Sequence, residues 1–254
     1  AALCSWTLDG TTAASWTPWV AFAMVTLTAL LHLFGIRLVS LVNDVGVVAE
    51  IVASIALTAV LLVLYYWNGA QDVSFLVDRT SPMNGAAAGV SAFALSMLMG
   101  AWCLTGFEAA ADLAEETHRP KHVVPRVILM AEVSSAVCGF LLLAGLILAI
   151  DDPSTAAQHE NLVIAILVNK LGNAWMPLVM LVVLVSIFDC GVASMAAATR
   201  IVFSLARDNM LPYSATLKGV HRRWQTPAGA IFLVWLISTA VLLGFQRLEI
   251  INSI

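Results

Sequence analysis

Two acidic residues inside long apolar segments are the side chains of this sequence with the clearest chemical potential. Glu108 closely follows Gly106, and Asp189 lies near the middle of another apolar segment. Neither acid has a basic residue three or four positions away that could pair with it on one helix face. An ionised side chain is costly in lipid, so each acid is expected to be protonated, to face a ligand or to hydrogen-bond another helix. For Asp189, the ligand-facing and the structural interpretations both stay open.

The residues that precede Glu108 predict a break in a membrane helix. Glycine at position 106 lowers the cost of unwinding, and a carboxyl beside it is held at depth only where freed backbone groups or a ligand meet it. A helix broken near the bilayer midplane exposes carbonyls from its first half and amides from its second half, which together bind small charged or zwitterionic solutes. Trp102, one turn earlier, is expected either to cover a substrate ammonium group by a cation–π contact or to be an ordinary packed core residue.

The composition sets the class of protein that must position these residues. Of the 254 residues, 61% are hydrophobic and 11% are charged, whereas soluble domains carry about a quarter charged residues. A water-soluble protein is therefore excluded. The net charge of −4 leaves no basic surface for nucleic acid, and the four cysteines include no Cys-x-x-Cys pair. We expect no nucleic-acid partner, no metal site and no cofactor.

Apolar segments long enough to cross about 30 Å of hydrocarbon predict six transmembrane helices. They are residues 18–36, 45–67, 90–111, 127–150, 174–205 and 227–246. Helix is expected in each, because a lone segment in lipid must satisfy its own backbone hydrogen bonds. The sequence therefore predicts an all-α integral membrane protein, inserted in the cell membrane as a multi-pass chain.

The distribution of basic residues predicts which loops face the cytoplasm, where Lys and Arg are retained. One set of alternate loops holds nine Lys and Arg residues and the other holds three. Residues 1–17, 68–89 and 151–173 and the C-terminus are therefore expected outside. Because external placement of both ends is unusual for a complete inner-membrane protein, and the chain does not begin with Met, we expect it to be a piece of a longer protein.

Two blocks of sequence, in order and at matching spacing, resemble the amino acid–polyamine–organocation (APC) permeases. The first block begins with Gly106-Phe-Glu108, continues to Pro120 and is followed by Val-Pro125-Arg126. The second block is Arg200-Ile-Val-Phe-Ser-Leu-Ala-Arg207-Asp208-Asn-Met-Leu-Pro212, and Thr226-Pro227 opens the next span. The segment from Leu31 to Arg37 is a weaker match, with His32 where the family commonly has Asn.

The resemblance implies a fold and a place for this chain within it. Such permeases are similar to the leucine-transporter fold, which has two inverted five-helix repeats and two extra helices. Residues 1–254 would form a single transmembrane transporter domain fragment that covers about the fourth to the ninth helix, with the second repeat beginning at about residue 90. The first helix, whose own break holds the substrate carboxylate, would lie outside this chain. The fragment by itself is therefore not expected to transport.

Family resemblance also implies roles for residues that match its motifs. The substrate-binding residues would be Trp102 as an aromatic gate and Thr105, Gly106, Phe107 and Glu108 in the broken segment, with Glu108 a candidate proton-sensitive group. In some relatives a lysine in the fifth helix takes the place of a sodium ion, but residues 45–67 contain no lysine. Coupling by that device is therefore not supported.

A helix that holds a cation ligand in sodium-coupled relatives carries three oxygen-bearing residues here, Ser186, Asp189 and Ser194. Oxygen is the ligand that a hard cation prefers, so these residues are candidates for a coupling-ion or proton site. Serine in a membrane helix also commonly bonds its own i−4 carbonyl or packs against a neighbour, which is the alternative interpretation.

Charged residues beyond the predicted membrane edge form a candidate cytoplasmic gate. Glu115 and Glu116 lie in one cytoplasmic loop and Arg207 lies at the start of another. We expect an acidic–basic contact between these loops in the outward-open state. The alternative is two solvated charged loops without a contact.

The sequence as a whole predicts a secondary active transporter of amino acids or related small amines, with alternating access around the break near Gly106. Its expected partners are a small-molecule substrate, the lipid bilayer and a coupling proton or sodium ion. An enzyme is not expected, because Gly-x-Ser-x-Gly is absent and His159-Glu160 lacks the second histidine of a zinc site. A channel or a structural membrane subunit is the alternative, and Gly106 with Glu108 argues against it. The solute and the driving ion stay open.

Overall fold

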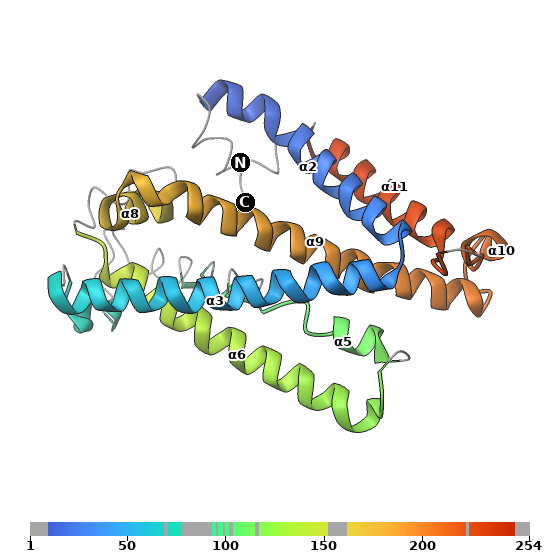
Figure 1. Ribbon diagram of the computed structural model, residues 1–254, viewed down its shortest axis with the longest axis horizontal. Coiled ribbons are helices and arrows are strands. Elements are labelled where there is room, and N and C mark those ends of the chain that lie inside the picture. The colour runs from blue at the N-terminus through green and yellow to red at the C-terminus, as the bar shows by residue number, and fades with distance from the viewer. Residues whose placement is uncertain are drawn as a thin grey trace. The chain divides into compact units, whose positions relative to one another are not determined.

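The computed structural model describes residues 10–68, 71–77, 93–94, 96–98, 100–101, 104–114, 117–151, 162–221 and 224–246, and regular structure in these residues is helical (Figure 1). The α-helices are α2 (Gly10–Leu33), α3 (Ile36–Asn68), α5 (Ala109–Asp112), α6 (Pro120–Leu148), α8 (Leu162–Leu171), α9 (Met176–Arg207), α10 (Ser214–Leu217) and α11 (Ala228–Gln246). Two short 3₁₀ helices are η1 (Val73–Val77) and η3 (Asn173–Trp175).

Four segments of the described chain are long and apolar enough to cross a membrane. They are Trp16–Leu33, Ile36–Trp67, Pro120–Leu148 and Asn173–Arg207, whereas Leu162–Leu171 and Ala228–Gly244 are apolar but shorter. The predicted all-helical class is confirmed. The count of six spans stays a prediction, because much of residues 90–111 lies outside the described residues.

Helix boundaries differ from the predicted spans where polar residues continue a helix. The helix α3 begins at Ile36 rather than at residue 45, and its first turns include Arg37 and Asp44. The helix α6 begins at Pro120 rather than at residue 127, and proline at the first position supplies a backbone angle suited to a helix start. For α3 and α6, the prediction was too short because hydropathy finds apolar stretches, whereas polar residues also form helices. The helix α8 lies inside the segment 151–173 that was predicted as an external loop, and it was missed for another reason: it is apolar but too short to be found as a membrane span.

The chain divides into two compact units, of which the first contains residues 1–50 and 178–254. In this unit α2 and α11 lie side by side, and their shared core with α9 contains Ala29, Met195 and Ile231 (Figure 1). The indole of Trp235 on α11 packs beside Phe22 on α2, with ring centroids 6.4 Å apart. The core of this unit is therefore built from three helices that are distant in sequence.

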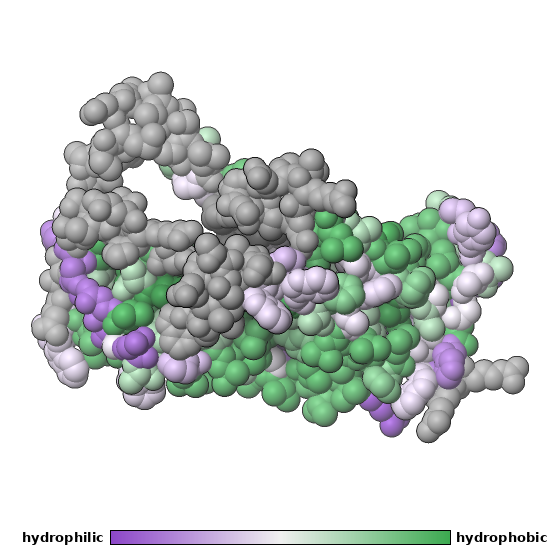
Figure 2. Space-filling view, turned by 90° about the horizontal axis from the view of Figure 1, so that it is seen from above, coloured by the Kyte–Doolittle hydropathy of each residue, from purple (hydrophilic) through white to green (hydrophobic). Residues whose placement is uncertain are grey.

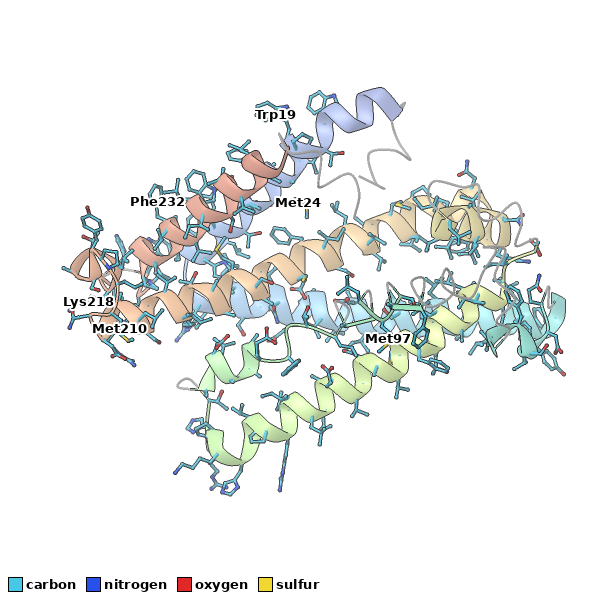
Figure 3. The ribbon with its side chains drawn as sticks, turned by 180° about the vertical axis from the view of Figure 1, so that it is seen from behind. Trp19, Met24, Met97, Met210, Lys218 and Phe232 are labelled. Carbon is cyan, nitrogen blue, oxygen red and sulfur yellow. The ribbon has the colours of Figure 1, made fainter. Side chains whose placement is uncertain are left out.

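At one end of the first unit, the turn between α2 and α3 packs against the segment that follows α9. Gly35 turns the chain between α2 and α3 with a φ of +109°, which glycine adopts without strain. Phe34 in this turn meets Trp224 edge-on at 5.6 Å, and the Thr226 hydroxyl donates a 3.5 Å hydrogen bond to the carbonyl of Leu33. The short helix α10 lies in the same connecting segment, where Lys218 donates a 2.9 Å hydrogen bond to Asn209 (Lys218 is labelled in Figure 3).

The second unit contains residues 51–177. The remainder of α3 packs against α6 where Gly145 allows close approach, because a Cβ on Gly145 would lie 3.3 Å from the Cβ of the fully buried Leu61. Beyond the end of α6, Asp151 is paired with Lys170 of α8 at 2.6 Å. The Gln71 amide donates to the carbonyl of Ile150 at 3.1 Å and so ties the segment after α3 to the end of α6.

The described helices expose apolar side chains along most of their length, as Figure 2 shows by the predominance of green over the visible coloured surface. Hydrophilic residues, in purple, occupy a smaller part of the coloured surface in that view. Several exposed aromatic residues lie near helix ends, as expected at membrane–water interfaces; they are Trp16 and Trp19 near the start of α2, Tyr66 and Trp67 near the end of α3, and Trp175 just before α9. This apolar surface suits a lipid environment, because contact with lipid removes the cost of exposing apolar side chains to water.

Candidate functional site

Regular helix is absent from residues 104–108, between helical residues 100–101 and the short helix α5. Gly106 has a φ of +100°, in the left-handed region that other residues adopt only with strain. The amide of Leu104 donates to the carbonyl of Ala101, and the amide of Ala109 donates to the carbonyl of Gly106. Each of these bonds spans three residues rather than four, so the α-helical hydrogen-bonding pattern is not maintained here.

Glu108 folds back onto the irregular segment. One of its carboxylate oxygens, Oε2, accepts a 3.1 Å hydrogen bond from the amide of Gly106, and its own carbonyl accepts bonds from the amides of Ala111 and Asp112 that begin α5. The side chain of Glu108 is exposed. An exposed acid is thus held beside main-chain polar groups, and a carboxylate in this position can accept further hydrogen bonds from a cationic group.

The other predicted substrate-binding residues have different outcomes. Thr105 and Phe107 lie in the irregular segment and both are exposed. A Cβ added at Gly106 would meet no atom within 4 Å, so the space beside the segment is open. Trp102 lies outside the described residues. The geometry therefore brings Gly106 and Glu108 together and leaves the aromatic gate as a prediction.

Asp189, the second candidate acid, lies on α9 and is almost completely buried, with 4% of its surface exposed. Its carboxyl group contacts α3 at Gly46. A Cβ on Gly46 would lie 2.5 Å from Cγ of Asp189 and 2.6 and 2.9 Å from its two oxygens, so only glycine leaves room there. The Oδ1 atom of Asp189 has no hydrogen-bond partner among the described residues.

Two further acids of α3 lie near Asp189. The charge of Asp44 acts on Asp189, and the charge of Asp189 acts on Glu50. Glu50 follows Gly46 by four residues, which places both on one face of α3. The contact between α3 and α9 therefore gathers acidic groups around a glycine.

The two serines predicted to accompany Asp189 lie on different faces of α9. Ser186 precedes Asp189 by three residues and shares its face. Ser194 follows by five residues, roughly 140° around the helix, and lines a cavity of about 410 Å³ between α2, α9 and α11. That cavity is largely apolar, with Met24 (labelled in Figure 3), Phe188 and Val234 among its lining residues. The structure therefore does not bring Ser194 and Asp189 together.

The candidate gate is only partly described. Arg207 is exposed at the end of α9, with Nε 3.5 Å from Oδ1 of its neighbour Asp208. Glu115 and Glu116 lie outside the described residues, so the predicted contact between the loops stays a prediction. Among the described residues, no group of three or more His, Cys, Asp or Glu side chains could hold a metal ion.

Sequence reasoning missed Gly46, the residue that receives the carboxyl group of Asp189. A signal was present, because Gly46 lies one helical turn before the intramembrane acid Glu50, and small residues allow helices to approach closely in membranes. The sequence did not reveal which helix meets that turn.

A sequence model described as "Amino acid permease" matches residues 2–250 of the chain. Among curated relatives, amino-acid permease 2 of Neurospora crassa is 27% identical over 195 residues, which are 72% of this chain and 35% of the relative. Amino-acid permease BAT1 of Arabidopsis thaliana is 26% identical over 220 residues, which are 83% of this chain and 42% of the relative.

A bacterial protein is also similar to this chain. The low-affinity putrescine importer PlaP of Escherichia coli K12 is 24% identical over 219 residues, which are 85% of this chain and 47% of the relative. The chain thus spans between about a third and a half of the length of these relatives. Together with the long apolar helices, the matches confirm the prediction of a multi-pass protein of the cell membrane.

Proposed function

The chain belongs to the amino acid permease family, as its resemblance to APC permeases predicted, and on this premise we propose that it is part of a secondary active transporter of amino acids or related small amines. Two relatives are named as amino-acid permeases and one as a putrescine importer, which supports both substrate classes. We place the chain in a single transmembrane transporter domain with six spans and a fold of two inverted five-helix repeats.

The observation that carries this proposal is the irregular segment around Gly106. Solutes with an ammonium group need a negatively charged partner, and Glu108 offers a carboxylate that accepts a hydrogen bond from a main-chain amide. In the proposed mechanism, Trp102, Thr105, Gly106, Phe107 and Glu108 line one side of the substrate site. Flanking helices rock around this segment, which opens the site alternately to the two sides of the membrane.

Coupling and gating complete the proposed cycle. A proton or a sodium ion supplies the drive, and the candidate groups are Glu108 and the residues Ser186, Asp189 and Ser194 on α9. Glu115 or Glu116 contacts Arg207 when the cytoplasmic side is closed. These loops are predicted to be cytoplasmic because they contain most of the basic residues.

The proposal is tested by uptake into proteoliposomes that contain the complete protein. A panel of amino acids, diamines and choline is offered with and without a pH or sodium gradient. We expect concentrative uptake of at least one primary amine. Ionic current without concentrative uptake would instead identify a channel, and the absence of both would leave a structural subunit.

The role of Glu108 has its own test in the same assay. Glu108→Gln keeps the shape of the side chain and removes its charge, so we expect lower uptake or a flatter dependence of uptake on pH. Glu132→Gln, a change at an acid of α6, is the matched control and is expected to behave as wild type. Wild-type uptake in Glu108→Gln would remove this acid from the mechanism.

A further inference from the structure

The contact between α3 and α9 holds a carboxyl group in surroundings that do not suit its ionised form. Only 4% of the surface of Asp189 is exposed, and its Oδ1 atom is without a hydrogen-bond partner among the described residues. Burying an unpaired charge is costly, so such a group normally takes up a proton or binds a cation. A purely structural role would be expected to satisfy this oxygen by a hydrogen bond to another helix.

The shape of the contact favours the smallest cation. The carboxyl group of Asp189 lies directly against the main chain of Gly46, at distances that leave no space for even a methyl group. A metal ion needs several oxygen ligands around it, and the described residues provide no such group of acidic, histidine or cysteine side chains. Of the two serines predicted with Asp189, Ser194 faces the cavity toward α2 and α11 instead, and Ser186 adds only one hydroxyl oxygen on the face of Asp189. A proton needs only one oxygen.

The charged groups around this contact also favour a proton. Both are acids on α3: Asp44 acts on Asp189, and Asp189 in turn acts on Glu50, which shares a helix face with Gly46. On the other side, α2 packs against α9 through Thr28, opposite Gly191, and Nδ1 of the buried His32 lies 2.8 Å from the carbonyl oxygen of Thr28 on its own helix. Two carboxylates near each other are stabilised when one proton neutralises one of them.

We propose that Asp189 and Glu50 form a two-carboxyl site that binds one proton at the contact between α3 and α9 and thereby couples transport to a proton gradient. The inference rests on the proposed transport function. Proton binding converts one carboxylate to a carboxylic acid and changes the charge of the pair from −2 to −1. Loss of that proton restores the repulsion between the two helices, which supplies a physical link between protonation and helix position.

The experiment compares two modes of transport in proteoliposomes with the complete protein. Accumulation driven by a pH gradient requires proton coupling, whereas exchange of labelled for unlabelled substrate across the membrane does not. We expect Asp189→Asn, which mimics the protonated acid, to abolish gradient-driven accumulation and to retain exchange. Glu50→Gln is expected to weaken the pH dependence in the same direction, and Glu132→Gln is the control for removal of an intramembrane acid elsewhere.

Two outcomes of that comparison would overturn the inference. If Asp189→Asn still accumulates substrate under a pH gradient like wild type, Asp189 does not bind the coupling proton. If wild type requires a sodium gradient and Asp189→Asn loses that requirement, the site binds sodium. Gly46→Ala provides a second route to the same test, because its Cβ would displace the carboxyl group of Asp189. It should alter the pH dependence while the purified protein keeps its elution profile.

A measurement without substrate separates this inference from the proposed function. Infrared difference spectra of the purified protein between acidic and alkaline pH report the C=O stretch of protonated carboxylic acids. We expect one such band to disappear in Asp189→Asn and to persist in Glu132→Gln. An unchanged band pattern overturns the proton site whether or not the protein transports, and failure of wild type to take up any solute overturns the proposed function alone.

Discussion

The indole nitrogen of Trp235 on α11 donates a 3.2 Å hydrogen bond to the hydroxyl of Thr26 on α2, far away in sequence. In this first unit, the bond and the neighbouring ring of Phe22 hold two apolar helices in one register. Polar contacts between membrane helices contribute only about 0.6 kcal/mol on average. Such contacts therefore determine which helix faces meet as much as they stabilise the protein.

The bond between Trp235 and Thr26 predicts a small, coupled loss of stability. Trp235→Phe removes the donor and keeps an aromatic ring, so we expect the free energy of unfolding to fall by about 0.5–1.5 kcal/mol. Thr26→Val should cost a similar amount, and the double variant should cost less than the sum of the two. Chemical unfolding in detergent measures all four proteins. Strict additivity would show that the two groups do not interact.

Gly106 is predicted to tolerate no side chain, although space is available beside it. A Cβ there meets no atom, but the φ of +100° is strained for any other residue. We expect Gly106→Ala to cost about 1–3 kcal/mol or to force the segment toward regular helix, with loss of uptake by the complete protein. Gly100→Ala is the matched control, since Gly100 is helical and equally open. Equal uptake in the two variants would contradict a role for the left-handed conformation.

Gly229 at the start of α11 is predicted to be required for its contact with α10. A Cβ there would lie 2.7 Å from the carbonyl oxygen of Thr216 and 3.2 Å from Cα of Leu217, both main-chain atoms. Gly229→Ala is therefore expected to destabilise the protein by about 1–3 kcal/mol, as overpacking does. Gly244→Ala in the same helix meets no atom within 4 Å and should be tolerated. Thermal unfolding of the two variants measures the difference, and similar melting temperatures would exclude the close contact.

The proposed gate predicts that charge reversals at its two sides compensate each other. Arg207→Glu should reduce uptake by the complete protein, because an attractive contact becomes repulsive, and adding Glu115→Arg or Glu116→Arg should restore part of it. Asp208→Asn is included because Arg207 also contacts Asp208. This variant removes the local pair alone, so its uptake shows how much of the effect of Arg207→Glu comes from losing the contact with Asp208 rather than from the gate. Additive effects of the two reversals would indicate solvated loops without a contact.

The sequence determined the class of this protein because membrane insertion depends on local properties. Long apolar segments must satisfy their backbone hydrogen bonds within themselves in lipid, so their length and composition suffice to predict helices such as α2, α3, α6 and α9. The motifs around Gly106 and Arg207 likewise indicated the family without any knowledge of packing. Glycine beside an acid indicated where regular helix ends, although the role of that segment in a broken transmembrane helix stays a prediction.

Only the tertiary structure decided which helix faces meet. The helices are apolar on nearly all sides, so their periodicity gives little indication of which face a partner covers. The approach of Asp189 to Gly46 and the separation of Ser194 from that acid depend on how α9 is rotated against α2 and α3. Such rotation is set by close packing between residues distant in the chain, and no local pattern of residues contains that information.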